Sequence, residues 1–166
     1  MALPHPLATI EYPSSDGLPM AESDFQRKPL TYAVEALDIC FQHRADVYVS
    51  GNMFIYYEEG NPEAVVAPDV FVVFGTAKRE RSSYFLWQEP KGHDFVLEIT
   101  SRRTRSQDQG SRHGTSAFLG IAEYCQYDPT GDYLRLPIQG LRLVGDHYEA
   151  LPTRQSPDGA LSVSSA

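Results

Sequence analysis

Two carboxylates stand in apolar runs of the sequence, where acids are unexpected. Asp69 opens the run "DVFVVF" directly after Pro68, and Glu98 lies inside the run "FVLEIT". Side chains alternate along a strand, so Glu98 shares a face with Val96 and Thr100. A lone buried carboxylate is costly, and it either takes up a proton or finds a cation, a hydrogen-bond donor or a metal. If the two runs pair as neighbouring strands, Asp69 and Glu98 predict a site for a hard divalent ion.

Oxygen donors of this kind suit Mg²⁺ or Mn²⁺, which in phosphodiester cleavage orient and activate water and neutralise the developing charge. A second arrangement fits the same residues. In it, Asp69 caps a turn by binding backbone amides, and Glu98 pairs with an arginine such as Arg102 or Arg112. The residues alone leave both arrangements open.

The elements expected around these acids make an α/β (α+β) domain with a mixed central sheet flanked by helices. Apolar positions recur at helical spacing from Ser23 or Asp24 to about His43, although Pro29 indicates a later start or a kinked first turn. The runs "DVYVS" and "MFIYYE" are expected to form neighbouring strands or one bent strand. Further expected elements are strands in "DVFVVFG", "FVLEITS" and "AEYCQYDP", a weak helix over 106–121 and a hairpin turning at Gly145-Asp146.

One domain is expected over residues 22–152. Residues 1–21 contain four prolines and predict an extended arm, and residues 153–166 predict a flexible tail. No apolar stretch approaches the roughly 20 residues that cross a bilayer, and the first residues lack a secretory pattern, so a soluble, cytoplasmic protein is expected. Cys40 and Cys125 stand in apolar surroundings without metal-ligand spacing, and both are predicted to be buried thiols.

The formal charge of −8 at pH 7 argues against a general phosphate-binding surface, so any contact with nucleic acid must be local. Of the two basic clusters, "KRER" at 78–81 is expected to be solvated loop charge, and "RRTR" occupies 102–105. His93 and His113 are expected at the surface. No Gly-x-Ser-x-Gly elbow accompanies them, which disfavours a nucleophile-based hydrolase. Glycosidase chemistry would need an aromatic-lined cleft that the sequence does not indicate.

Four segments carry a resemblance to a known family: "VAPDVFVVFG", "FVLEITSRRTR", "DQGSR" and "GIAEYCQYDPTGDYL". From Tyr12 to about Leu151 the chain resembles the bacterial Uma-two family of endonucleases, a branch of the restriction-endonuclease-like PD-(D/E)XK fold. The resemblance implies that Asp69 and Glu98 bind Mg²⁺ or Mn²⁺ and that DNA is the substrate. It also implies that Glu22, in the first helix, is a further acidic member of the site. Relatives of this fold often form homodimers, which the exposed hairpin edge could support.

The chain departs from the family pattern at the basic position. Where the fold usually has a lysine two places after the glutamate, this sequence has Thr100. Relatives that lack this lysine often carry one on the following helix, with a tyrosine after it, where this chain has Arg112 and Ser116. Arginine can clamp phosphate but is a poor proton shuttle. Two hypotheses follow: a metal-dependent endonuclease with Arg112 or Arg103 stabilising phosphate charge, or a catalytically inactive member that acts as a binding or interaction module.

Overall fold

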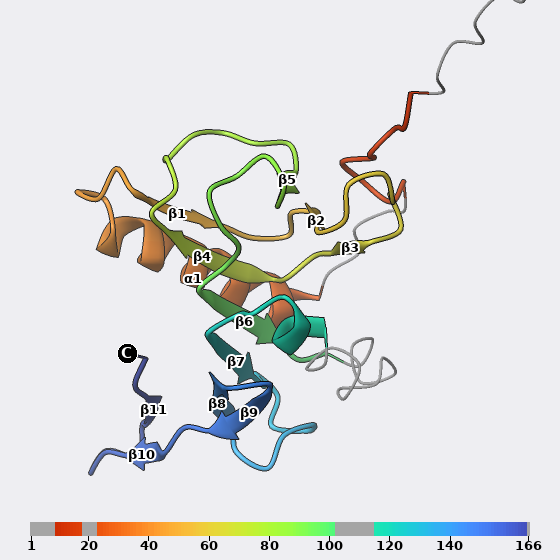
Figure 1. Ribbon diagram of the computed structural model, residues 1–166. Coiled ribbons are helices and arrows are strands. Elements are labelled where there is room, and N and C mark those ends of the chain that lie inside the picture. Colours follow the sequence, from red (N-terminus) through yellow and green to blue (C-terminus); the bar gives the residue numbers. More distant parts are fainter. Residues whose placement is uncertain (1–8, 18–22, 102–114, 166) are drawn as a thin grey trace, which may run out of the picture.

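The computed structural model describes residues 9–17, 23–101 and 115–165. Within them the main sheet has six strands in the order β1-β4-β6-β7-β8-β9, and only the β6–β7 pair is parallel. Two small sheets, β3-β2-β5 and β10-β11, complete the arrangement (Figure 1). The expected mixed sheet is confirmed. The elements are α1 (Asp24–Cys40), β1 (Val47–Ser50), β2 (Ile55–Tyr56), β3 (Val65–Val66), β4 (Val70–Phe74), β5 (Tyr84–Phe85), β6 (Phe95–Ile99), β7 (Glu123–Tyr127), β8 (Ile138–Val144), β9 (His147–Ala150), β10 (Thr153–Gln155) and β11 (Leu161–Val163).

Helix α1 begins at Asp24, so the later start suggested by Pro29 is wrong. The carbonyl of Ser23 accepts hydrogen bonds from the N–H groups of Gln26 and Arg27, at 3.0 and 2.9 Å, and these bonds form the first turn ahead of the proline. Pro29 therefore follows a first turn that is already hydrogen-bonded, and it does not prevent the helix from starting at Asp24. No described helix is long and apolar enough to cross a membrane.

The two cysteines differ in environment. Cys125 is buried in β7, as predicted, and burial raises the pKa of its thiol to about 11. Cys40 is exposed, and its predicted burial is wrong. The neighbouring Phe41 packs edge-on against Phe74 of β4, with ring centroids 5.4 Å apart. Adjacent helix positions differ by about 100° around the axis, so the turn that directs Phe41 to the sheet directs Cys40 to solvent.

The chain leaves the main sheet after β1, so "DVYVS" and "MFIYYE" do not become neighbouring strands. Asn52 has a positive φ of 49°, which turns the backbone. The following strand, β2, pairs with β3 in the antiparallel sense and with β5 in the parallel sense. This second sheet lies over one face of the main sheet.

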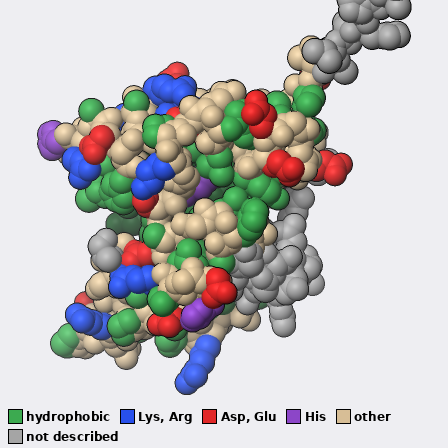
Figure 2. Space-filling model, viewed as in Figure 1, with side chains coloured by type: hydrophobic (Ala, Val, Ile, Leu, Met, Phe, Trp, Pro, Cys, Tyr) green, Lys and Arg blue, Asp and Glu red, His purple; other side chains and the backbone are tan. Residues whose placement is uncertain are grey.

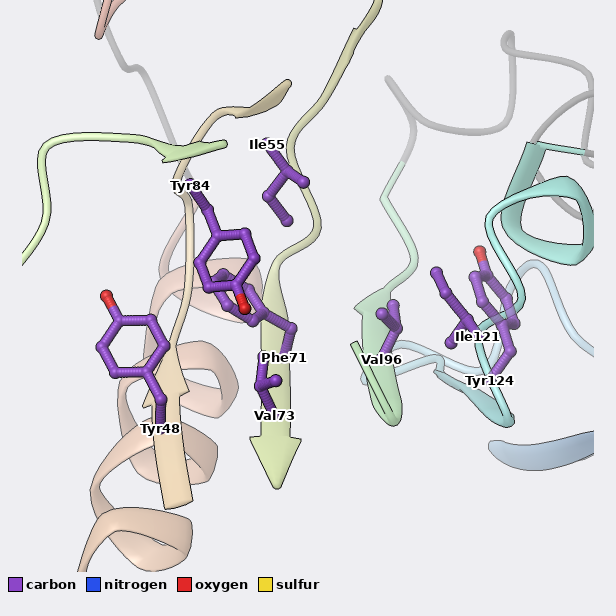
Figure 3. Packing of buried hydrophobic residues seen from close by; sticks show 8 residues of the cluster. All are labelled: Tyr48, Ile55, Phe71, Val73, Tyr84, Val96, Ile121 and Tyr124. Atoms are coloured by element: carbon purple, nitrogen blue, oxygen red, sulfur yellow. The ribbon is translucent and has the colours of Figure 1, made fainter. Parts of the chain in front are cut away.

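Side-chain alternation gives the main sheet two different faces. Phe71 of β4 and Val96 of β6 face each other in register and belong to the buried core, together with Tyr84 of the second sheet (Figure 3). Phe74, which contacts Phe41 at the end of α1, projects from the opposite face of β4. The main sheet is thus layered between α1 and the small sheet. The cluster comprises Tyr48, Ile55, Phe71, Val73, Tyr84, Val96, Ile121 and Tyr124.

The segment from Thr153, for which the sequence predicts a flexible tail, forms a hairpin of β10 and β11 that contacts β8. The contact is close at Gly140, where an added Cβ would lie only 2.5 Å from Cγ1 of Val163. A side chain at position 140 would displace the hairpin, so this strand position needs glycine.

The "KRER" segment is not uniformly solvated, and for Arg81 that expectation is wrong. The Arg81 side chain is only 2% exposed, and it binds both carboxylate oxygens of Glu89 at 2.8 and 3.0 Å. Its guanidinium also lies 4.2 Å from the ring centroid of Tyr48. The hydrogen bond from Arg81 lowers the pKa of the Glu89 carboxyl. Pairing and ring contact together compensate this buried charge.

His93 is also buried, at 4% exposure, and its predicted surface position is wrong. Its ring packs edge-on against Phe71, with centroids 4.8 Å apart, and Nε2 has no hydrogen-bond partner among the described residues. Burial lowers the pKa of His93 to about 4, against a smaller opposing effect of Asp94. The imidazole is therefore neutral in the folded protein at neutral pH.

We predict that His93 makes the fold sensitive to acid. The folded pKa is depressed below the unfolded value, so the stability is fully present above about pH 6.5 and is lost as the pH falls towards 4. Between about pH 7.5 and about pH 4.5, the loss due to this group should be about 2 kcal/mol, measured by urea unfolding. The pH dependence should shrink by this amount in His93→Leu. It should persist in His147→Leu, which replaces an exposed histidine, and an unchanged profile in His93→Leu would contradict the assignment.

Candidate active site

The pairing of β4 with β6 places Asp69 opposite Glu98. Val70 pairs with Leu97 and Phe71 with Val96 in an antiparallel ladder. One further step in this register sets the two acids across from each other. Directly opposite residues project from the same face. The expected pairing of the two strands is confirmed, and the acids share the face that carries the core rather than the α1 face.

Asp69 is held by the backbone of the neighbouring strand. It is 7% exposed, and its Oδ2 accepts a hydrogen bond from the N–H of Ile99 at 2.7 Å. This bond is of the amide-capping kind that the sequence allowed for Asp69. It extends the β4–β6 ladder through a side chain and fixes the carboxylate at the end of both strands.

A glycine turn fixes the backbone of Asp69 from the other side. The N–H of Asn52 lies 3.1 Å from the carbonyl oxygen of Pro68 and 3.2 Å from that of Asp69 and donates to both. A Cβ on Gly51 would lie 2.2 Å from the Asp69 carbonyl oxygen and 3.1 Å from Cγ2 of Val34. Only glycine permits this close approach, so the turn after β1 positions the aspartate.

Glu98 lines a hollow of about 350 Å³ on the core-bearing face. Ser116, at the position where the family resemblance predicts tyrosine, is 8% exposed and lines the same hollow. No lysine or arginine of the described chain is among its lining residues. These are Val65, Val66, Ala67, Pro68, Val96, Glu98, Thr115, Ser116, Leu119, Ile121 and Tyr124.

Thr100 does not substitute for the missing lysine. Its hydroxyl donates a hydrogen bond to the carbonyl oxygen of Tyr127 at 3.1 Å, and its N–H donates to the same oxygen at 2.8 Å. The side chain is thus engaged in tying β6 to β7. A threonine carries no charge with which to balance a phosphate.

Gln126 is a site residue that the sequence reasoning missed. It pairs with Glu98 in the parallel β6–β7 register, so the two side chains leave the sheet on the same side. It is 7% exposed, and its side-chain amide has no hydrogen-bond partner in the described part of the chain. The available signal was one polar residue within the otherwise apolar "YCQY". Asp69, Glu98 and Gln126 therefore form one row across β4, β6 and β7, which we call the polar row.

The polar row suits a hard metal ion, although the described residues contain no group of three or more His, Cys, Asp or Glu that could hold one. Mg²⁺ commonly uses one or two carboxylates, with water and substrate phosphate supplying the other ligands. Two opposed carboxylates and an amide oxygen meet that requirement. Glu22 and Arg112, together with Arg102 and Arg103, lie outside the described residues, so their roles remain predictions from the sequence.

Comparisons with known proteins identify the family and support the fold. The Uma2 family model, described as "Putative restriction endonuclease", matches residues 2–165. A crystal structure of a "putative nuclease belonging to DUF820" from Anabaena variabilis superposes with a TM-score of 0.54 at 14% identity, covering 84% of this chain and 75% of that one. No curated protein matches the chain. The fold is therefore restriction-endonuclease-like, and the family match supports a nuclease role.

We predict that Gly51→Ala disrupts the site through the backbone of Asp69. The added methyl group would lie 2.2 Å from the carbonyl oxygen of Asp69. The backbone must move to relieve this overlap, which should lower the free energy of unfolding by about 1–3 kcal/mol or more. Gly92→Ala is the matched control, because its nearest contact would be an ordinary 3.6 Å to Leu86. Urea unfolding of both variants checks this. Equal stability of the two would show that the turn does not constrain Asp69.

Proposed function

The chain belongs to the Uma2 family, and we propose that it is a metal-dependent endonuclease that hydrolyses DNA phosphodiester bonds at the hollow beside Glu98. The observation that carries the proposal is the register of β4 against β6, whose continuation by one step beyond Val70 and Leu97 sets Asp69 opposite Glu98. Two acids in this relation repel each other, and a divalent cation relieves the repulsion.

Mg²⁺ or Mn²⁺ would be held by Asp69 and Glu98, with Gln126 as an additional oxygen donor. When bound, such an ion polarises the phosphate and lowers the pKa of a water molecule. Asp69 keeps its orientation through the N–H of Ile99. Glu98 borders the hollow, where it can accept a hydrogen bond from the attacking water. The Gln126 amide can donate to a phosphate oxygen.

Contact with DNA must be local in this protein. Among the described residues on the face shown in Figure 2, acidic and basic side chains are interspersed and form no continuous basic surface, and the chain has a formal charge of −8. Cations close to the polar row would have to compensate the phosphates. Arg112 is the proposed phosphate clamp, and Arg103 is a second candidate. Binding that uses so few cations should have a shallow salt dependence.

One observation favours a second candidate function, that of a catalytically inactive binding module. Thr100 is engaged with Tyr127, and no cation of the described chain lines the hollow. A member that keeps the acids without a cation could bind metal and DNA without cleaving. Metal binding and cleavage must therefore be measured separately.

We predict that Asp69→Asn and Glu98→Gln each reduce Mn²⁺-dependent nicking of supercoiled plasmid by more than about 100-fold, because losing even an outer partner of a metal ligand costs about 10–100-fold. Both changes preserve side-chain shape, and the amide introduced by Asp69→Asn keeps an oxygen that can accept the Ile99 N–H. Urea unfolding should therefore show a folded protein. Glu63→Gln, which neutralises an exposed acid, is the control and should nick normally.

Calorimetric titration with Mn²⁺ separates the two functions. Binding with nicking, both lost in the Asp69 and Glu98 variants, supports the endonuclease. Binding without nicking indicates the inactive module. Nicking that survives both substitutions would show that Asp69 and Glu98 do not form the catalytic site.

We predict that Gln126→Leu lowers the activity and raises the stability of the protein. Because Gln126 is only 7% exposed, an apolar side chain at this position should raise the free energy of unfolding by up to about 1 kcal/mol through burial of more apolar surface. Nicking and Mn²⁺ affinity should both fall by about tenfold, as expected when a group that supports a metal site is lost. Gln88→Leu, at an exposed position, is the control and should change neither property. A parallel loss of stability and activity would instead give Gln126 a structural role.

A further inference from the structure

The outer side of α1 carries an exposed apolar stripe made of Phe25, Tyr32 and Ile39. These residues recur every seven positions, about two helical turns, and are 65%, 75% and 63% exposed. The inner side of the helix faces the turn after β1 through Val34, and the C-cap residue Phe41 packs against Phe74 of β4. A surface helix needs only one apolar face. A second apolar face, aligned along the helix, indicates an interaction surface.

The charges beside the stripe are arranged for a particular partner. Lys28 and Glu35 are also seven residues apart, so they lie on the same flank of the stripe. Both are exposed, and neither forms an ion pair within the described part of the chain. Arg27 and Asp38, by contrast, are each paired. Among the described residues, a cation without an ion-pair partner therefore precedes Tyr32 and an anion without one follows it.

We propose that a second copy of this chain covers the stripe, with the two α1 helices packed antiparallel about a twofold axis at Tyr32. In this arrangement Phe25 lies opposite the partner's Ile39. Lys28 lies within one residue of the level of the partner's Glu35, on the same flank, and symmetry repeats the pair. A parallel twofold arrangement would instead place Lys28 and the partner's Glu35 on opposite flanks of the interface, where they could not pair. The stripe is thus complementary to itself only in the antiparallel sense.

The interface would be small and the dimer reversible. Helix α1 has 17 residues and is about 25 Å long, which places a single helix pair at the low end of specific interfaces. We expect a dissociation constant in the micromolar range. The inference does not rest on the proposed nuclease function, because α1 covers the sheet face opposite the hollow.

Sedimentation velocity of the full chain over a range of concentrations tests the proposal. The wild type should approach twice the 18.6 kDa of one chain as its concentration rises. Tyr32→Asp should raise the dissociation constant by at least about tenfold, because it places two like charges at the centre of the interface. Phe118→Asp is the matched control. It changes an aromatic residue that is 80% exposed outside α1, and it should leave the dimer unchanged.

Charge reversal tests the antiparallel register. Lys28→Glu and Glu35→Lys should each weaken self-association several-fold, since each brings like charges together. Mixing the two variants should restore association, because each supplies the charge that the other lacks. A chain that stays monomeric at high concentration overturns the proposal. A dimer that is insensitive to Tyr32→Asp uses another surface, such as the edge of β9, and overturns it equally, as does a mixture that fails to associate.

Discussion

The register of β4 against β6 is the constraint on which the site depends. Phe71 and Val96 are buried opposite each other in the core, and the same register sets Asp69 opposite Glu98. A slip of one residue would turn the side chains of one strand to the face covered by α1. The hydrophobic core therefore selects the arrangement of the acids. The hydrogen bond from the N–H of Ile99 to the Asp69 carboxylate lies at the end of the β4–β6 pairing, on the side of the hollow.

The polar row interrupts a sheet that would be more stable without it. Buried polar groups cost free energy unless they are hydrogen-bonded. Asp69 has such a bond, whereas the amide of Gln126 has no partner in the described chain. An apolar side chain at position 126 would stabilise the fold more than glutamine does. Departures of this kind from locally favourable choices are expected at functional sites, where stability is exchanged for a ligand contact. The polar residue next to Glu98 in the β6–β7 register therefore supports a site at this place in the sheet.

Sequence pattern predicted the elements that carry the acids and missed the contacts between distant segments. β4 and β6 are short apolar runs bounded by turn residues, which local pattern recognises well. Gln126 was visible as one polar residue, but its place beside Glu98 depends on the parallel pairing of β6 with β7. His93 and Arg81 lie in connecting segments whose burial arises from rings contributed by other strands. Local periodicity contains no information about such partners.

The proposed catalytic site and the proposed dimer interface lie on opposite sides of the main sheet. α1 occupies one face and the hollow opens on the other, so covering the outer stripe of α1 leaves Glu98 accessible. In an antiparallel dimer the two hollows would face away from each other. One straight duplex could not enter both at once. The net charge of −8 on each chain also disfavours wrapping DNA around such an assembly. Each site would therefore meet its own stretch of nucleic acid, which favours cleavage of single strands over a concerted cut of both strands.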